Sequence, residues 1–170
     1  MEARFRPGAQ SESMTTIEIY EHKLVVCESE IDLVGHVNNV VYLQWMQDAA
    51  MAHSSALGWP AQRYQQHGAG WVARLHQIEY LQPAYEGDEV IVRTWVADMK
   101  KVTSLRRYQM IRTDPLRSDS DGSRKEITLA VAHTNWAYID FSTRGPKRIP
   151  PEIASAYQIV TDNSSATSRS

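Results

Sequence analysis

The chain has 170 residues, of which 42% are hydrophobic and 22% are charged. Such a length is typical of one domain, because single cores usually stop growing beyond roughly 250 residues. The composition excludes a fully disordered chain. The formal net charge of −2 argues against a dedicated nucleic-acid-binding protein, which normally carries a basic excess.

The cysteine content indicates the cellular location, and the polar ends of the chain indicate the limits of the domain. Cys27 is the only cysteine, which excludes an intrachain disulfide and favours a reducing, cytoplasmic location. No apolar run approaches the ~18 residues that a membrane span needs, so we expect no membrane association. Because both ends are polar, we expect a flexible segment at 1–15, one domain at 16–158 and a flexible tail at 159–170.

The first half of the chain predicts a strand over 17–27, a turn-rich segment over 28–39 and then a helix. The helix is indicated by side chains spaced three and four apart, which form one face about five turns long. Asn38 or Asn39 can cap its start, and Gly58 followed by Pro60 ends it. The residues on this face are Leu43, Met46, Ala50, His53 and Leu57, and we expect His53 to be a core residue.

After Gly70 the apolar pattern alternates with a period of two. It predicts four strands, at 71–81, 89–98, 102–113 and 126–140, and a short helix at 151–157 follows. Consecutive strands with short links are normally antiparallel neighbours, so we expect a four-strand meander after the long helix. One buried helix against a curved antiparallel sheet is an α+β architecture.

Several common catalytic patterns are missing from the sequence. There is no Gly-x-Ser-x-Gly nucleophile motif and no phosphate-binding loop. The six histidines show neither His-x-His nor His-Glu-x-x-His spacing, so we expect no metal site.

The informative segment is 28–42, where a carboxylate, a glycine and two asparagines precede the long helix. The unpaired N–H groups and partial positive charge of a helix start can hold an oxyanion. Asp32, seven residues ahead of Asn39, can face the same space, which supports acyl transfer or hydrolysis. The alternative is structural: Asp32 forms an Asx turn and the asparagines only cap the helix. The spacing leaves both open.

The run from Asp32 to Leu43 closely resembles the signature of hotdog-fold acyl-CoA thioesterases of the 4-hydroxybenzoyl-CoA thioesterase family, Asp-x-x-Gly-(His)-Val-Asn-Asn-x-x-Tyr. Segments 78–88 and 143–150 are similar to that family's second strand and turn and to its C-terminal segment. The resemblance covers roughly residues 17–158 and implies a hotdog fold. In that fold, a long central helix is wrapped by a curved antiparallel sheet of about five strands.

The resemblance implies a hydrolase of acyl-coenzyme A or acyl-carrier-protein thioesters that needs no metal and no bound cofactor, since coenzyme A is part of the substrate. It implies that Asp32 acts as nucleophile or as general base, and that the Asn39 backbone N–H polarises the thioester carbonyl. Gly35 lets the backbone approach the substrate. Benzoyl-type members often lack the His-Val-Asn-Asn sequence, so whether the acyl group is aromatic or aliphatic stays open.

The resemblance also suggests substrate-binding residues around this motif. His36, Asn38 and Tyr42 either shape the thioester pocket or act as a turn residue, a cap and a packing residue. Basic residues suit the phosphates of coenzyme A, although each also fits a solvated charged face. The strongest are concentrated beside a turn: Arg144, Lys147 and Arg148; further candidates are Lys100, Lys101, Arg106 and Arg107.

A single helix on a single sheet leaves a sheet edge and apolar surface uncovered, with Trp71 and Trp95 as candidates. We therefore expect a homo-oligomer; the resemblance implies dimers or tetramers, with edge-to-edge pairing and the site at the dimer interface. Two other functions are a non-catalytic acyl-CoA-binding module, which Asp32 argues against, and a hotdog dehydratase or hydratase. The latter requires an Asp-x-Asn-Pro-x-His type of motif, which the sequence lacks.

Overall fold

The computed structural model describes residues 18–118, 122 and 124–161, so the expected flexible segment at 1–15 and most of the expected tail lie outside the described residues. The elements in chain order are β1 (Tyr20–Val25), the 3₁₀ helix η1 (Glu28–Glu30), α1 (Asn39–Ala56), α2 (Ala61–His67), β2 (Ala69–Tyr80), β3 (Glu89–Met99), β4 (Thr103–Ser118), β5 (Arg124–Asp140) and α3 (Pro151–Ala154). No helix among them is long and apolar enough to cross a membrane.

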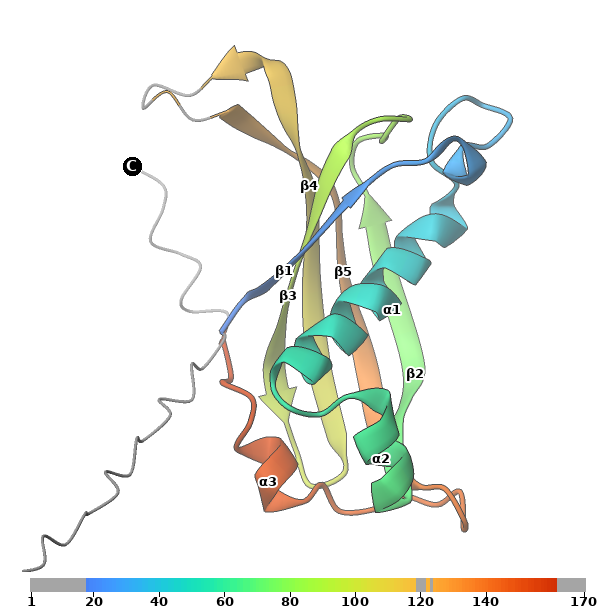
Figure 1. Ribbon diagram of the computed structural model, residues 1–170, viewed down its shortest axis with the longest axis vertical. Coiled ribbons are helices and arrows are strands. Elements are labelled where there is room, and N and C mark those ends of the chain that lie inside the picture. The colour runs from blue at the N-terminus through green and yellow to red at the C-terminus, as the bar shows by residue number, and fades with distance from the viewer. Residues whose placement is uncertain (1–17, 119–121, 123, 162–170) are drawn as a thin grey trace, which may run out of the picture.

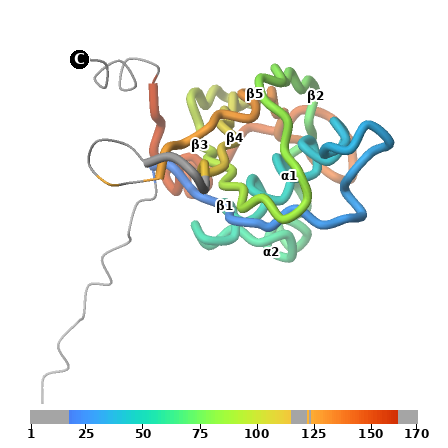
Figure 2. Tube along the Cα trace, turned by 90° about the horizontal axis from the view of Figure 1, so that it is seen from above, coloured from blue at the N-terminus to red at the C-terminus, as the bar shows by residue number. Residues whose placement is uncertain are grey.

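Five antiparallel strands form one curved sheet in the order β1-β3-β4-β5-β2, and α1 lies across one face of it (Figures 1 and 2). This confirms the predicted α+β hotdog architecture. The predicted four-strand meander is wrong at one strand, because β2 pairs with β5 and not with β3. Only β3, β4 and β5 form a meander, and β2 is an edge strand.

The link 81–88 makes this strand order possible. It must cross three strand spacings, about 14 Å, and an extended link of its length reaches roughly 26 Å. Backbone hydrogen bonds hold it along the way: Leu81 N donates to Leu129 O at 2.8 Å, and Val37 N donates to Ala84 O at 2.9 Å. Although the link 81–88 is short, β2 and β3 are therefore not neighbours in the sheet.

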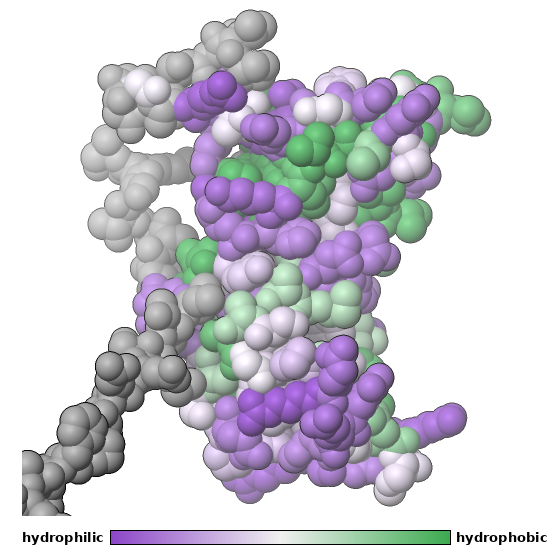
Figure 3. Space-filling model, in the orientation of Figure 1, coloured by the Kyte–Doolittle hydropathy of each residue, from purple (hydrophilic) through white to green (hydrophobic). Residues whose placement is uncertain are grey.

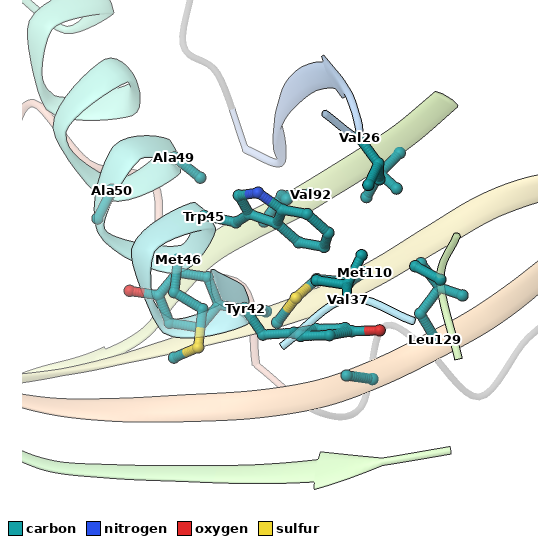
Figure 4. Close-up of a cluster of buried hydrophobic side chains, with 14 residues drawn as sticks. Val26, Val37, Tyr42, Trp45, Met46, Ala49, Ala50, Val92, Met110 and Leu129 are labelled. Carbon is teal, nitrogen blue, oxygen red and sulfur yellow. The ribbon is translucent and has the colours of Figure 1, made fainter. Parts of the chain in front are cut away.

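The core lies between α1 and the sheet (Figure 4). Met46 and Ala49 are completely buried on the helix side and face Val92, Met110 and Leu129 of the strands, which are also completely buried. Small residues on this face of α1 let the helix approach the sheet closely. His53 is 1% exposed, which confirms the expected core position.

The start of α1 is as predicted: Asn38 is the N-cap, and its Oδ1 accepts a hydrogen bond from Val40 N at 3.0 Å. α2 was not predicted, because its seven residues are too few to show an apolar period. The long helix ends at Ala56, shortly before Gly58 as expected, and Pro60 is the N-cap of α2. Contacts with α1 and β2 hold α2 in place, since the hydroxyl of its Tyr64 forms hydrogen bonds with Ser54 Oγ (3.0 Å) and Trp71 Nε1 (3.1 Å).

Several boundaries differ from the predictions: β1 is shorter, at Tyr20–Val25, and β4 runs to Ser118 and not to 113. The final helix ends at Ala154 and not near 157. The packed chain also continues past 158, because Ile159 forms a parallel bridge with Val96 and Val160 N donates to Val96 O at 2.9 Å.

Candidate active site

The segment between η1 and α1 is a closed turn. Ile31 and Val37 form an antiparallel bridge at its base, and Asp32 N donates to His36 O at 2.9 Å. Gly35 N donates back to Asp32 O at 3.1 Å, and Gly35 has a φ of +90°. This backbone conformation strains residues that have a Cβ atom, which explains the glycine at this position.

The two carboxylate oxygens of Asp32 have different surroundings. Oδ1 accepts a hydrogen bond from Val34 N at 2.8 Å, so the Asx turn of the structural alternative is present. Oδ2 lies 3.8 Å from His36 Nδ1, and the Asp32 side chain is 27% exposed. One oxygen thus builds the turn while the other faces His36 and solvent. The structural and the chemical role of Asp32 are compatible.

The start of α1 presents an open backbone donor. Asn38 N donates to Glu30 O at 2.9 Å, and the Asn38 side chain caps Val40 N. Among the described residues, nothing accepts a hydrogen bond from Asn39 N. The Asn39 carbonyl is held in place by the Tyr80 hydroxyl of β2, which donates to it at 3.0 Å. The open N–H therefore lies at the positive end of a long, anchored helix.

Glu30 links the turn to the helix. Its Oε1 accepts from Trp45 Nε1 at 3.0 Å and its Oε2 accepts from Cys27 N at 2.8 Å. Neither Glu30 nor Tyr80 was predicted from the sequence to be part of the site. Their contacts join residues 15 and 41 positions apart, and no local pattern indicates such pairs.

Tyr42 does not lie beside Asp32 at the surface. It is 2% exposed, and its ring packs edge-on against Tyr80 at 5.2 Å between centroids. Burial raises the pKa of Tyr42 above its ordinary value. This placement supports the packing role of Tyr42.

The basic residues near the chain's end lie far from Asp32 within one chain. Tyr80, which contacts the start of α1, pairs with Ala130 of β5, whereas the basic segment follows Asp140 at the other end of β5. The ladder from Ala130 to Asp140 is roughly 33 Å long. Figure 1 shows the basic segment beside α2, at the opposite end of the molecule from the turn before α1.

The three predicted phosphate-binding residues also differ from one another. Lys147 Nζ lies 3.0 Å from Asp140 Oδ2 and is already paired. Hydrogen bonds from Ser142, together with Lys147, hold the pKa of Asp140 well below its usual range. Arg144 and Arg148 are exposed and form no ion pair with a described residue. Of the further basic candidates, Arg106 is not on a solvated face, because it is 5% exposed and lies under α1.

Exposed apolar side chains surround the turn and follow the β2 edge. Leu33, Val34 and Val40 are exposed beside Asp32, and Val72 and Leu75 are exposed on β2. Figure 3 shows this apolar surface at the upper right, over the turn before α1. The two tryptophans expected to be uncovered are instead half-buried. Apolar surface is thus open as expected, but at other residues.

No group of three or more His, Cys, Asp or Glu side chains in the described part of the chain could hold a metal ion. The site brings together a carboxylate, a half-exposed imidazole and a helix N-terminus.

The chain matches a protein-family model and several solved structures. Residues 26–157 match the family model of the thioesterase-like superfamily. No curated protein matches the chain.

Among solved structures, the fold is similar to that of a 1,4-dihydroxy-2-naphthoyl-CoA thioesterase from Synechocystis, with a TM-score of 0.68, 18% identity and coverage of 81% of this chain and 94% of that one. It is also similar to a mutant 4-hydroxybenzoyl CoA thioesterase complexed with 4-hydroxybenzoyl CoA, with a TM-score of 0.72, 14% identity and coverage of 84% and 100%.

A third similar structure is that of a candidate oleoyl thioesterase from Lactobacillus plantarum, with a TM-score of 0.70 and 22% identity. The match covers 84% of this chain but 51% of that protein, so the chain spans about half of its length. The family match extends over most of the chain, and the fold as a whole is similar to these structures. The chain therefore belongs to the thioesterase-like superfamily and has the hotdog fold.

Proposed function

We propose that the protein hydrolyses acyl-coenzyme A or acyl-carrier-protein thioesters to a free acid and a thiol. The observation that carries the proposal is the juxtaposition, across one closed turn, of an open Asp32 oxygen and an open Asn39 N–H at a helix start. Membership of the thioesterase-like superfamily supports the same reaction class.

The proposed chemistry needs a polarised carbonyl and an attacking oxygen. The Asn39 N–H donates to the thioester oxygen and stabilises the negative charge that develops there. In one route, Asp32 Oδ2 attacks the carbonyl carbon, the C–S bond breaks, and water then hydrolyses the mixed anhydride. In the other, Asp32 takes a proton from water as water attacks the carbonyl carbon, the C–S bond then breaks, and the proton passes to the departing thiolate. Neither route uses a metal or a bound cofactor, and we propose that none takes part.

The direct test measures thiol release from a panel of acyl-CoAs of different chain length, aliphatic and aromatic. We expect steady-state hydrolysis of at least one of them, with free thiol formed in step with free acid. Binding of acyl-CoA without thiol release would instead identify a non-catalytic binding module. The exposed free thiol of Cys27 fits a reducing compartment, and we propose that the protein acts in the cytoplasm.

We further propose that the working unit is a dimer paired along β2. This strand is an edge of the sheet and carries exposed apolar side chains, including Val72 and Leu75. In a two-fold antiparallel pairing, the start of one β2 lies beside the end of the other. The Arg144 and Arg148 segment lies at the start of β2 and Asp32 lies near its end, so the pairing brings the basic pair of one chain to the Asp32 of its partner.

Light scattering at micromolar concentration is expected to give a mass at least twice the 19.3 kDa of one chain. The reason is the apolar surface on the turn and along β2, which a monomer leaves in water. A mass of one chain at this concentration would contradict the dimer.

Replacing both exposed arginines, Arg144→Ala with Arg148→Ala, is expected to raise KM for acyl-CoA more than it lowers kcat. Phosphate contacts far from the thioester stabilise the bound substrate and the transition state about equally. Steady-state kinetics with one acyl-CoA measure the effect. Arg124→Ala with Lys125→Ala removes the same charge from exposed positions of β5 and serves as the control. An unchanged KM in the Arg144 and Arg148 variant would place the phosphate contacts elsewhere.

A further inference from the structure

A cavity of about 510 Å³ lies under the C-terminal half of α1, between that helix, α2 and the sheet. Its helix wall begins at Gln47 and includes Ala50, and Ala50 is roughly 17 Å along α1 from Asn39. The cavity is therefore separate from the open donor at the start of α1. Its volume lies within the range of roughly 300–1,000 Å³ that small-molecule sites occupy.

Most of the cavity wall is apolar. Trp59, Trp71 and Phe141 contribute aromatic rings, and Val96 and Met99 contribute aliphatic surface from β3. Such a wall suits the apolar body of a ligand, because burying apolar surface is favourable without any directional contact. The aromatic and aliphatic lining alone does not select one ligand over another.

The selective element is Arg106 of β4, which lines the cavity and is 5% exposed. Both hydrogen bonds that it makes with described residues come from Nη1, which donates to His53 Nδ1 at 3.0 Å and to Thr94 Oγ1 at 3.1 Å. These bonds fix the guanidinium in place. They also leave the Nε and Nη2 donors for a ligand or water.

Nothing in the described part of the chain neutralises the Arg106 charge. Arginine can only donate, so His53 Nδ1 is the acceptor and His53 is the neutral tautomer with its proton on Nε2. The Tyr157 ring, 5.7 Å from Arg106 Cζ, provides a weak cation–π contact. No described carboxylate forms an ion pair with Arg106. A buried cation without a counter-ion is costly, and a guanidinium cannot avoid the cost by losing its proton.

We propose that this cavity binds an apolar molecule that carries one carboxylate, with the Nε and Nη2 edge of Arg106 as its counter-ion. A carboxylate matches two adjacent guanidinium donors in a bidentate pair, and the fixed Nη1 leaves that one edge presented. The apolar body then lies against Trp59 and Trp71. The proposal does not depend on thioester hydrolysis, because it concerns a different part of the molecule.

The test compares two probes that differ only in charge, octanoate and octan-1-ol, by calorimetry and by the fluorescence of the tryptophans that line the cavity. We expect the wild-type protein to bind octanoate at least about tenfold more tightly, because a hydrogen-bonded charge pair discriminates strongly against a neutral group. Equal affinities for the two probes, or binding of neither, would overturn the proposal.

Two variants separate the effect of the Arg106 charge from the effect of the cavity volume. Arg106→Gln is expected to remove the preference for octanoate while octan-1-ol binds as before, and the exposed Arg124→Gln is the matched control that retains the preference. Ala50→Leu fills the cavity and is expected to weaken both probes. If Arg106→Gln fails to fold, Ala50→Leu alone tests whether octanoate binds in this cavity. Unchanged octanoate binding in Ala50→Leu would place the ligand elsewhere. A folded Arg106→Gln that retains the preference would also overturn the proposal.

The carboxylate could belong to a free acid or to the far end of an acyl group. Hexadecanedioyl-CoA and palmitoyl-CoA differ in a distal carboxylate, and their acyl chains are long enough for the roughly 21 Å along α1 from Asn39 to His53, the partner of Arg106, so they distinguish these sources. If the acyl group is the source, Arg106→Gln raises KM for hexadecanedioyl-CoA only. If the source is a free acid, octanoate binding is lost while both KM values stay unchanged. Failure of all thioester hydrolysis would contradict the proposed function and leave the octanoate result standing.

Discussion

Replacing Asp32 with asparagine is expected to lower kcat for acyl-CoA hydrolysis by about 10²- to 10⁴-fold, the usual cost of losing a general base. A lost nucleophile would cost more. The amide can perform neither role, whereas its oxygen can still accept the hydrogen bond that Val34 N gives to Oδ1. We therefore expect the turn, the thermal stability and acyl-CoA binding to survive. The Asn39 N–H is also untouched, so some residual rate should persist.

The experiment combines single-turnover kinetics with a binding measurement on the same Asp32→Asn preparation. Asp98→Asn is a suitable control, because Asp98 forms a surface ion pair with Lys100 at 3.5 Å and its side chain is 48% exposed. A folded Asp32→Asn protein that binds acyl-CoA and retains more than about half of the wild-type kcat would exclude Asp32 and the mechanism based on it.

Combining two defective chains in one dimer is expected to restore activity. One chain carries Asp32→Asn and the other carries Arg144→Ala with Arg148→Ala. If each site uses Asp32 from one chain and the basic pair from its partner, a mixed dimer contains one intact site and one site with both defects. At low acyl-CoA concentration, the mixed dimer should then show about half of the wild-type kcat/KM.

Mixed dimers can be isolated by giving the two chains different affinity tags and purifying on both. Doubly tagged wild-type dimers set the reference, and the two parent homodimers set the background. Activity equal to the mean of the parents would mean that Asp32 does not work with a partner's basic pair. This outcome would leave the thioesterase proposal intact, because the proposal rests on the turn within one chain.

Features of this protein that depend on neighbouring residues could be predicted from sequence. Asn38 caps α1 through a bond to Val40, two residues away, and the turn from Asp32 to His36 closes on itself. Gly35 has the positive φ that such a turn needs. The periods of 3.6 and 2 located the long helix and the strands, because each follows from how side chains leave a helix or a strand.

Features that depend on distant contacts were decided only by the tertiary structure. The pairing of β2 with β5, the hydrogen bond from Tyr80 to Asn39 and the separation of Asp32 from the basic pair by the length of β5 all depend on strand order. Arg106 looked like any other surface cation, yet the same alternation that buries Tyr108 and Met110 of β4 places it under α1. A local pattern shows which side chains share a face of a strand. Which face is buried, and beside which strand, is determined by the packing of the whole sheet against its helix.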